Sequence, residues 1–188
     1  MVDRNMADDK LAHGKLARGK VADRKLSEGK APESKTRGER PVHRRAHSDY
    51  RWEGVAELPY KEDDRALFKS ITRQVLFSDP ELRGELRYFE VAAGGFSTLE
   101  RHSHVHAVLI LRGRGHCLIG HEVRSLETRD LVSVPPLTWH QFRATQGEPL
   151  GFLCMVNAER DKPQLPSAAE LASLQADPEI AAFLRDEL

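Results

Sequence analysis

The chain of 188 residues contains the segment Arg101-His102-Ser103-His104-Val105-His106, in which histidines occupy alternate positions. A β-strand has a side-chain period of two, so this pattern predicts three imidazole rings on one face of one strand. A fourth histidine, His140, follows the pair Pro135-Pro136. Imidazole suits transition metals, whereas Mg²⁺ and Ca²⁺ prefer oxygen ligands. We therefore expect one divalent transition metal (Fe, Zn, Ni, Mn or Cu) bound by His102, His104, His106 and His140.

These histidines lie in two stretches that resemble the two motifs of the cupin superfamily. The first motif has the form G-(x)5-H-x-H-(x)3,4-E-(x)6-G, and residues 94–113 end on its last glycine, Gly113. The second has the form G-(x)5-P-x-G-x-x-H, and Pro135 and His140 match its proline and histidine. The resemblance covers roughly residues 86–156. It implies an all-β fold, a double-stranded β-helix of the cupin jelly-roll type, with His102, His104 and His140 as metal ligands.

The departures from these motifs carry information of their own. Counting back from Gly113 over the six-residue spacer of the motif leads to His106, which therefore stands where the family has a glutamate ligand, after a segment two residues shorter. Arg129 and Leu137 replace two motif glycines, which predicts a bulkier turn before His140. Four neutral imidazoles would leave the charge of the ion uncompensated, so we expect a stronger Lewis acid than in a site with three histidines and one glutamate.

The candidate catalytic residue is Glu100, which precedes His102 by two positions and is the nearest carboxylate in the sequence. A carboxylate beside a metal site can serve as a general base. It can also orient a histidine, or lie solvated at a strand edge, and both alternatives stay open. Glu90 is a second candidate if its strand turns it inward.

The first 48 residues differ in character from the rest of the chain. They carry 13 lysines and arginines against 7 acidic residues, whereas residues 49–188 carry 16 against 22. Lysine recurs every five residues from Lys10 to Lys35, a period that fits neither a helix nor a strand. We expect a disordered basic low-complexity tail over residues 1–48. Because acidic residues are interleaved with the basic ones, we expect no specific nucleic-acid partner; weak binding to nucleic acid or anionic surfaces is the alternative.

The remaining chain predicts a barrel domain over residues 49–162 and a helical tail over residues 163–188. Short strands with turn signals between them indicate a sandwich or barrel; we expect strands at residues 71–77, 86–91, 106–111, 116–119, 122–126, 131–134, 140–143 and 150–156. Ser167 and Glu170 form a capping-box pattern, and Pro178 suits the first position of a second helix. We expect this tail to pack on the barrel exterior or on the partner subunit of a possible homodimer.

Other side chains give weaker indications of a pocket. The five expected to fill the barrel interior are Tyr88, Trp139, Phe142, Phe152 and Met155. Three arginines could hold a carboxylate substrate, although an arginine in a strand more often lies on the exterior: Arg73, Arg87 and Arg143. Cys117 and Cys154 are too few for a disulfide framework, so we expect two reduced buried thiols, with a catalytic cysteine as the alternative.

The sequence shows no signal-peptide pattern and no apolar run of membrane-spanning length, so we expect a cytoplasmic protein with no membrane partner. The histidine set predicts a metal-binding protein that acts on a small organic molecule. We favour a mononuclear metal-dependent enzyme with dioxygenase-like chemistry, because a redox metal with open positions suits a chelating substrate and dioxygen. A non-catalytic small-molecule or metal-binding cupin is the first alternative, and a redox-neutral isomerase or lyase that uses Glu100 as base is the second.

Overall fold

The computed structural model describes residues 43–47, 49–60 and 69–185, which belong to one compact unit spanning His43–Leu188. The predicted tail therefore lies outside the described residues, except for its last few positions. Among these, Ala46–His47 forms β1, which pairs with β2 (Arg51–Trp52) in a short antiparallel hairpin.

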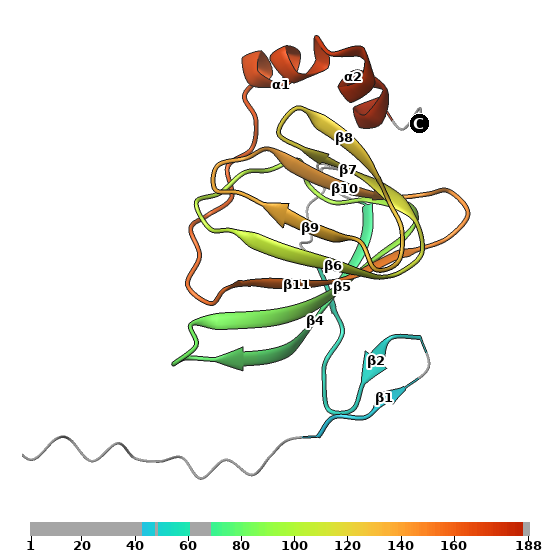
Figure 1. The fold of residues 1–188 in the computed structure, drawn as a ribbon, viewed down its shortest axis with the longest axis vertical. Helices are drawn as coiled ribbons and strands as arrows, with labels where there is room; N and C mark the ends of the chain where they lie inside the picture. Colours follow the sequence, from blue (N-terminus) through green and yellow to red (C-terminus); the bar gives the residue numbers. More distant parts are fainter. Residues whose placement is uncertain (1–42, 48, 61–68, 186–188) are drawn as a thin grey trace, which may run out of the picture. The chain divides into compact units, whose positions relative to one another are not determined.

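The barrel is built from one curled antiparallel sheet, as the sequence predicted (Figure 1). Its main path runs in the order β8-β7-β10-β5-β11-β6-β9, and β4 pairs with β3 and with the other edge of β5. The strands are β3 (Leu58–Pro59), β4 (Lys69–Asp79), β5 (Gly84–Phe96), β6 (His106–Arg112), β7 (Gly115–Ile119), β8 (Glu122–Leu126), β9 (Leu131–Val134), β10 (His140–Ala144) and β11 (Leu150–Asn157). The eight predicted strands are all present, and those of β4 and β5 extend beyond the predicted ends.

Alternation along each strand decides which side chains enter the barrel. In β11, Phe152, Cys154 and Val156 are buried, whereas Met155 between them is 55% exposed. This is the period of two expected for a strand with one face on the core. The buried cluster inside the curl consists of Ile71, Phe89, Val91, Val108, Ile110, Cys117, Leu126, Val132, Val134, Phe142, Ala144, Leu150, Phe152, Cys154 and Val156.

The helical tail packs on the outside of the barrel, which is one of the two placements that the sequence predicted. Helix α1 (Ala168–Gln175) begins with the predicted capping box, in which Ser167 and Glu170 bond each other's backbone amides. Helix α2 (Pro178–Arg185) follows and lies against β7 and β8 (Figure 1). A second buried cluster joins them to the barrel: Leu99, Leu118, Val123, Trp139, Leu174, Ile180 and Phe183. Neither helix has the length and apolar character needed to span a bilayer.

Three of the five aromatic and methionine side chains expected in the barrel interior lie elsewhere. Trp139 belongs to the cluster beneath the helices, and Met155 is exposed. Tyr88 is fully buried, but on the outer face, where Tyr50 stacks on it at 5.6 Å and Trp52 contacts it edge-on at 5.2 Å. The physical reason is that burial on this sheet comes from both faces, because the segment around β2 covers part of the outside.

Candidate metal centre

Three separate chain segments bring the histidines together inside the barrel. His106 is the first residue of β6, and His140 is the first residue of β10. His102 lies in the connection after Arg101, which pairs with Gln164. The rings of His102 and His106 are 4.5 Å apart between centroids, and those of His102 and His140 are 4.8 Å apart. His106 therefore points into the barrel, as its spacing from Gly113 predicted.

The expectation that His102, His104 and His106 share one continuous strand is wrong. Residues 102–105 form a bend, and the strand begins only at His106. The Nδ1 atom of His102 lies 2.9 Å from the carbonyl oxygen of His104 and closes this bend. Asp161 holds it from the other side, because its carboxylate accepts a 2.7 Å hydrogen bond from the amide of Ser103. The rings of His102 and His106 come together because the chain bends between them and a strand begins at His106. They do not lie at alternate positions of one strand.

Three ring nitrogens form a group with the dimensions of a metal site. One ligand atom from each of His102, His106 and His140 lies within 4.8 Å of the other two. The Nε2 atoms of His102 and His106 are 2.8 Å apart. Bonds from imidazole to a first-row metal are about 2.0–2.1 Å long, so ligand nitrogens of one ion lie about 3 Å from one another. The three side chains therefore fit a transition-metal ion.

Hydrogen bonds to the other ring nitrogen select the tautomer that this role requires. The Nδ1 atom of His140 lies 2.9 Å from the carbonyl oxygen of Thr138, just as that of His102 faces the carbonyl of His104. A carbonyl oxygen can only accept, so each Nδ1 carries the hydrogen. Each Nε2 then presents a lone pair to the centre of the group, which is the arrangement found in metal-binding histidines.

The surroundings of the three histidines favour the neutral rings. Burial, followed by the proximity of His140, His102 and His104, lowers the pKa of His106 to about 2. Burial is also the main cause that lowers the pKa of His102 and of His140. Protonated imidazolium cannot bind a metal, so these shifts keep the ligand form present at neutral pH.

His104 has a different position from the other three histidines. Its ring stacks on that of His102, with centroids 3.6 Å apart and an interplanar angle of 6°. Its Nδ1 is 2.8 Å from the Asp161 carboxylate. The ligand atoms that lie within 4.8 Å of one another come from His102, His106 and His140. His104 is therefore not in the group of converging nitrogens, and its role as fourth ligand remains a prediction that requires its ring to turn.

Glu100 lies beside this group and is 7% exposed. Its amide and carbonyl form both backbone hydrogen bonds with His140, at 3.2 and 3.0 Å. Residues opposed in this way in an antiparallel pair direct their side chains to the same face. Its charge raises the pKa of both His102 and His140 against the effect of burial. Glu90, the second carboxylate considered, instead accepts a hydrogen bond from the Tyr88 hydroxyl at 2.7 Å and pairs with Arg112.

Two small cavities meet at the histidines and differ in polarity. The inner cavity, of about 50 Å³, has a mostly apolar lining: Tyr60, Ile71, Phe89, Ser97, Thr98, Glu100, His106, Val108, His140, Phe142, Phe152 and Cys154. The outer cavity, of about 80 Å³, is lined by Tyr60, Arg87, Phe89, Glu100, His102, His104, His106, Cys154, Val156, Arg160, Asp161 and Pro163. A ligand at the histidines would therefore meet aromatic side chains on one side and charged side chains on the other.

Comparison with known proteins agrees with this architecture. Residues 87–156 match the Cupin domain family. The chain is 60% identical over 151 residues to a protein of Rhodospirillum rubrum named 1-methylthio-D-xylulose 5-phosphate methylsulfurylase, and the match covers 80% of this chain and 96% of that protein.

The chain belongs to the cupin superfamily.

Solved cupin structures support the same assignment. A cupin 2 conserved barrel domain protein from Rhodopseudomonas palustris is 56% identical, with a TM-score of 0.73, and the match covers 76% of this chain and 98% of that one. A cupin-2 domain protein from Rhodospirillum rubrum is 59% identical, with a TM-score of 0.71, over 79% of this chain and 99% of that one.

The turn before His140 keeps the backbone of the cupin motif without its glycines. Arg129 and Leu137 stand at the two glycine positions, and their φ angles are 86° and 54°. Both lie in the left-handed region that glycine adopts without steric cost and other residues adopt at a cost of about 1–2 kcal/mol. The amide of Leu137 donates a 2.7 Å hydrogen bond to the carbonyl of His102, so the strained turn is tied to the metal-site bend.

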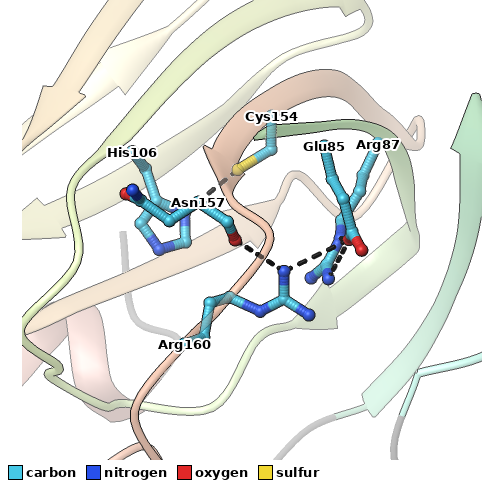
Figure 2. Close-up of polar contacts among 6 residues, drawn as sticks. All are labelled: Glu85, Arg87, His106, Cys154, Asn157 and Arg160. Atoms are coloured by element: carbon cyan, nitrogen blue, oxygen red, sulfur yellow. Dashed lines mark hydrogen bonds and ion pairs between the residues drawn. The ribbon is translucent and has the colours of Figure 1, made fainter. Parts of the chain in front are cut away.

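Cys154, which the sequence offered only as an alternative catalytic cysteine, lies beside the histidines. Its Sγ atom lies 3.0 Å from Nδ1 of His106 (Figure 2), and it lines both small cavities. Both cysteines are free and buried, as expected, and burial raises the pKa of the Cys154 thiol to about 12. The positive charges of Arg87 and Arg160 act in the opposite direction. The alternation Phe152, Cys154, Val156 in an apolar strand could have placed this thiol inside the barrel, but not beside a histidine.

A larger groove of the cupin barrel lies away from the converging nitrogens. It encloses about 590 Å³, and exposed apolar side chains such as Phe77, Leu82 and Met155 line it. His106 also borders this groove, but His102, His140 and Glu100 do not. We therefore place the functional site in the two smaller cavities, where the groups capable of chemistry converge.

Proposed function

We propose that this cupin is a metal-dependent enzyme that cleaves the carbon–sulfur bond of a 1-methylthio ketose phosphate, with Cys154 as acceptor of the methylthio group. The observation that carries the proposal is the contact of Cys154 with His106 inside a cavity shared with the other histidines. The 60% identity to a methylsulfurylase supplies the substrate class. The inner cavity supports it, because Phe89, Phe142 and Phe152 offer an apolar site for a methyl group.

The chemistry requires a thiol and a place for an electron pair. The Cys154 sulfur attacks the sulfur of the methylthio group, an S–S bond forms, and the bond between that sulfur and C1 breaks. The electron pair passes to C1, which adjoins the ketone carbon of the ketose and takes up a proton. A divalent ion held by His102, His106 and His140 would polarise the ketone oxygen and so lower the cost of this step.

The chain offers residues for the accompanying proton movement. If Nε2 of His106 held the ion, its Nδ1 would carry the hydrogen and donate it to Sγ of Cys154, which would favour the thiolate. Glu100 lines both cavities with Cys154 and carries the thiol proton to C1 in this scheme. The products are a 1-deoxy ketose phosphate and a methyl disulfide on Cys154. A second, external thiol then displaces the methylthio group and restores the enzyme.

The test separates the two cysteines in a single turnover. Protein loaded in turn with Mn, Fe, Ni, Cu or Zn is mixed with 1-methylthio-D-xylulose 5-phosphate without added thiol. We expect wild type and Cys117→Ala to gain the mass of one methylthio group on Cys154, and Cys154→Ala to form no product. Cys117 is the matched control, because it is also a buried free thiol but lines neither small cavity. Turnover by Cys154→Ala at the wild-type rate would exclude the thiol mechanism, and no substrate loss with any metal would exclude the reaction.

A redox-neutral isomerase or lyase is the second candidate, and the buried position of Glu100 beside His140 favours it. In that case Glu100→Gln would abolish turnover while Cys154→Ala would keep it. The dioxygenase chemistry that we favoured from the histidines finds no support in the 60%-identical relative, which is named for a different reaction. The expectation of a cytoplasmic location fits an external thiol as the second reactant and remains a proposal.

A further inference from the structure

Arg87 and Arg160 border the outer cavity. Figure 2 shows both arginines with Glu85, near His106. Arg87 donates to the Oε2 atom of Glu85 through Nε, at 2.7 Å, and also through Nη2. Arg160 donates from Nη1 to the same oxygen at 3.2 Å and to the carbonyl oxygen of Asn157 at 2.7 Å. Two guanidinium groups thus converge on one carboxylate oxygen.

Arg73 contributes a third guanidinium group beside the cavity, because its Cζ atom lies 5.9 Å from the centre of the Tyr60 ring, which lines the outer cavity. Burial lowers its pKa, and the charges of Arg87 and Arg160 lower it further, while Tyr60 and Glu85 oppose them. Its Nε atom is buried and has no hydrogen-bond partner among the described residues. A buried charged donor without a partner is costly. The cluster therefore contains three positively charged guanidinium groups around the carboxylate of Glu85. Not all of their hydrogen-bond donors have a partner among the described residues.

Strand register places this cluster at a defined distance from the histidines. Arg87 is the cross-strand neighbour of Cys154, and Glu85 is separated from His106 by Val156 alone. Adjacent strands lie about 4.8 Å apart, so β5 and β6 are about 10 Å apart across β11. That separation is on the order of the length of a phosphorylated five-carbon chain. Such a chain could place its ketone end at the histidines and its phosphate at the arginines.

We propose that Arg73, Arg87 and Arg160 form the subsite for the phosphate group of the substrate, and this rests on the proposed function for the identity of the rest of the molecule. A phosphate monoester carries a charge between about −1.5 and −2 and three acceptor oxygens. Its negative charge is opposite to that of the three guanidinium groups. Arginine donors recognise such oxygens in a planar, often bidentate manner. The carboxylates of Glu100 and Asp161 also line the outer cavity, and that of Asp161 accepts hydrogen bonds from Ser103 and His104 instead of from Arg87 or Arg160.

The test measures binding of D-xylulose 5-phosphate and of D-xylulose to metal-loaded protein by calorimetry, without any need for turnover. We expect wild type to bind the phosphate ester at least about tenfold more tightly than the free sugar. Arg160→Met and Arg73→Met, which lie on different elements, should each weaken binding of the ester by about tenfold to a hundredfold and leave that of the sugar unchanged. Arg124→Met is the control, because Arg124 is an exposed arginine on β8 that also pairs with a glutamate, Glu122.

The outcomes separate this inference from the proposed reaction. Equal affinity of wild type for the two sugars, or unchanged ester binding in both arginine variants, would overturn the phosphate subsite. A clear preference for the ester that both variants remove would support it even if 1-methylthio-D-xylulose 5-phosphate is not consumed. Metal content and melting temperature of each variant should equal those of wild type, and an ester-specific loss under those conditions excludes general damage to the fold.

Discussion

The Nε2 atom of His102 lies 2.8 Å from the Nε2 atom of His106, although the two residues come from different local structures, a bend and a strand start. His102 donates its Nδ1 hydrogen to a carbonyl, so its Nε2 carries a lone pair. A second lone pair at this distance would repel it. Either a hydrogen on one nitrogen or a metal cation must therefore lie between the two nitrogens. In the metal-bound protein the cation takes this place.

The convergence of the histidines predicts that His106 and His140 are both needed to bind the metal. His106→Ala and His140→Ala should each reduce metal occupancy to a small fraction of one ion per chain, because two remaining nitrogens make a weak site. Elemental analysis of protein purified without a histidine tag checks this. His121→Ala, in an exposed turn, is the control. Full occupancy in His106→Ala would contradict the assignment.

A graded effect is expected for His104, which stacks on His102 and is held by Asp161. His104→Ala and Asp161→Asn should each lower metal affinity by about 10–100-fold, the size typical of residues that orient ligands. Competition with a chelator of known affinity measures it. A complete loss of metal in His104→Ala, equal to that in His106→Ala, would instead show that His104 turns to become the fourth ligand predicted from its spacing.

Acid should destabilise the metal-free protein through the histidine cluster. An unfolded histidine has a pKa of about 6.5, whereas burial lowers that of His106 to about 2, so the unfolded state binds more protons between these values. Stability is therefore complete above about pH 6.5 and falls as the pH decreases, by at most about 1.4 kcal/mol per pH unit for each such histidine. Urea unfolding at several pH values measures this slope. His106→Gln should reduce it, and an unchanged slope in that variant would assign the effect to other groups.

The sequence predicted the strands and the inward direction of His106 because both depend on local alternation and spacing. It could not predict the bend at residues 102–105, since that bend depends on Asp161, a residue far along the chain. The contact of Cys154 with His106 could not be predicted either, because it depends on the pairing of β11 with β6. A single sequence contains no pattern that tells which residues on different strands become neighbours when the strands pair. For this reason Arg73 and Arg87 could be named as candidates but not placed.

The strained turn of the second cupin motif predicts a stabilising substitution. Leu137 is 54% exposed with φ of 54°, so Leu137→Gly removes a left-handed strain of about 1–2 kcal/mol and loses little burial. The greater freedom of glycine in the unfolded chain offsets about 0.4–1 kcal/mol. A net gain of about 0.5–1 kcal/mol in unfolding free energy should appear by urea denaturation. Leu131→Gly, at an exposed strand position without positive φ, should destabilise by about 0.5–1 kcal/mol and serves as control.

The start of the folded unit can be located by two truncations on either side of β1 and β2. Removal of residues 1–42 should leave the melting temperature and metal content unchanged, because their composition predicts no packed core. Removal of residues 1–52 should destabilise the barrel by about 2–4 kcal/mol, because it uncovers Tyr88 and takes away the rings of Tyr50 and Trp52. It also removes the carbonyl of Tyr50, which accepts a 2.9 Å hydrogen bond from the buried side chain of Gln74.

Thermal unfolding of both truncated chains beside the full chain provides the measurement. The point variant Tyr50→Ala in the full chain is the matched control, since it removes one of the two rings without shortening the protein. It should lose part of the stability lost on removing residues 1–52. If the chain lacking residues 1–42 melts as early as the one lacking residues 1–52, the basic segment is part of the folded domain, and the interpretation of its sequence as a low-complexity tail is wrong.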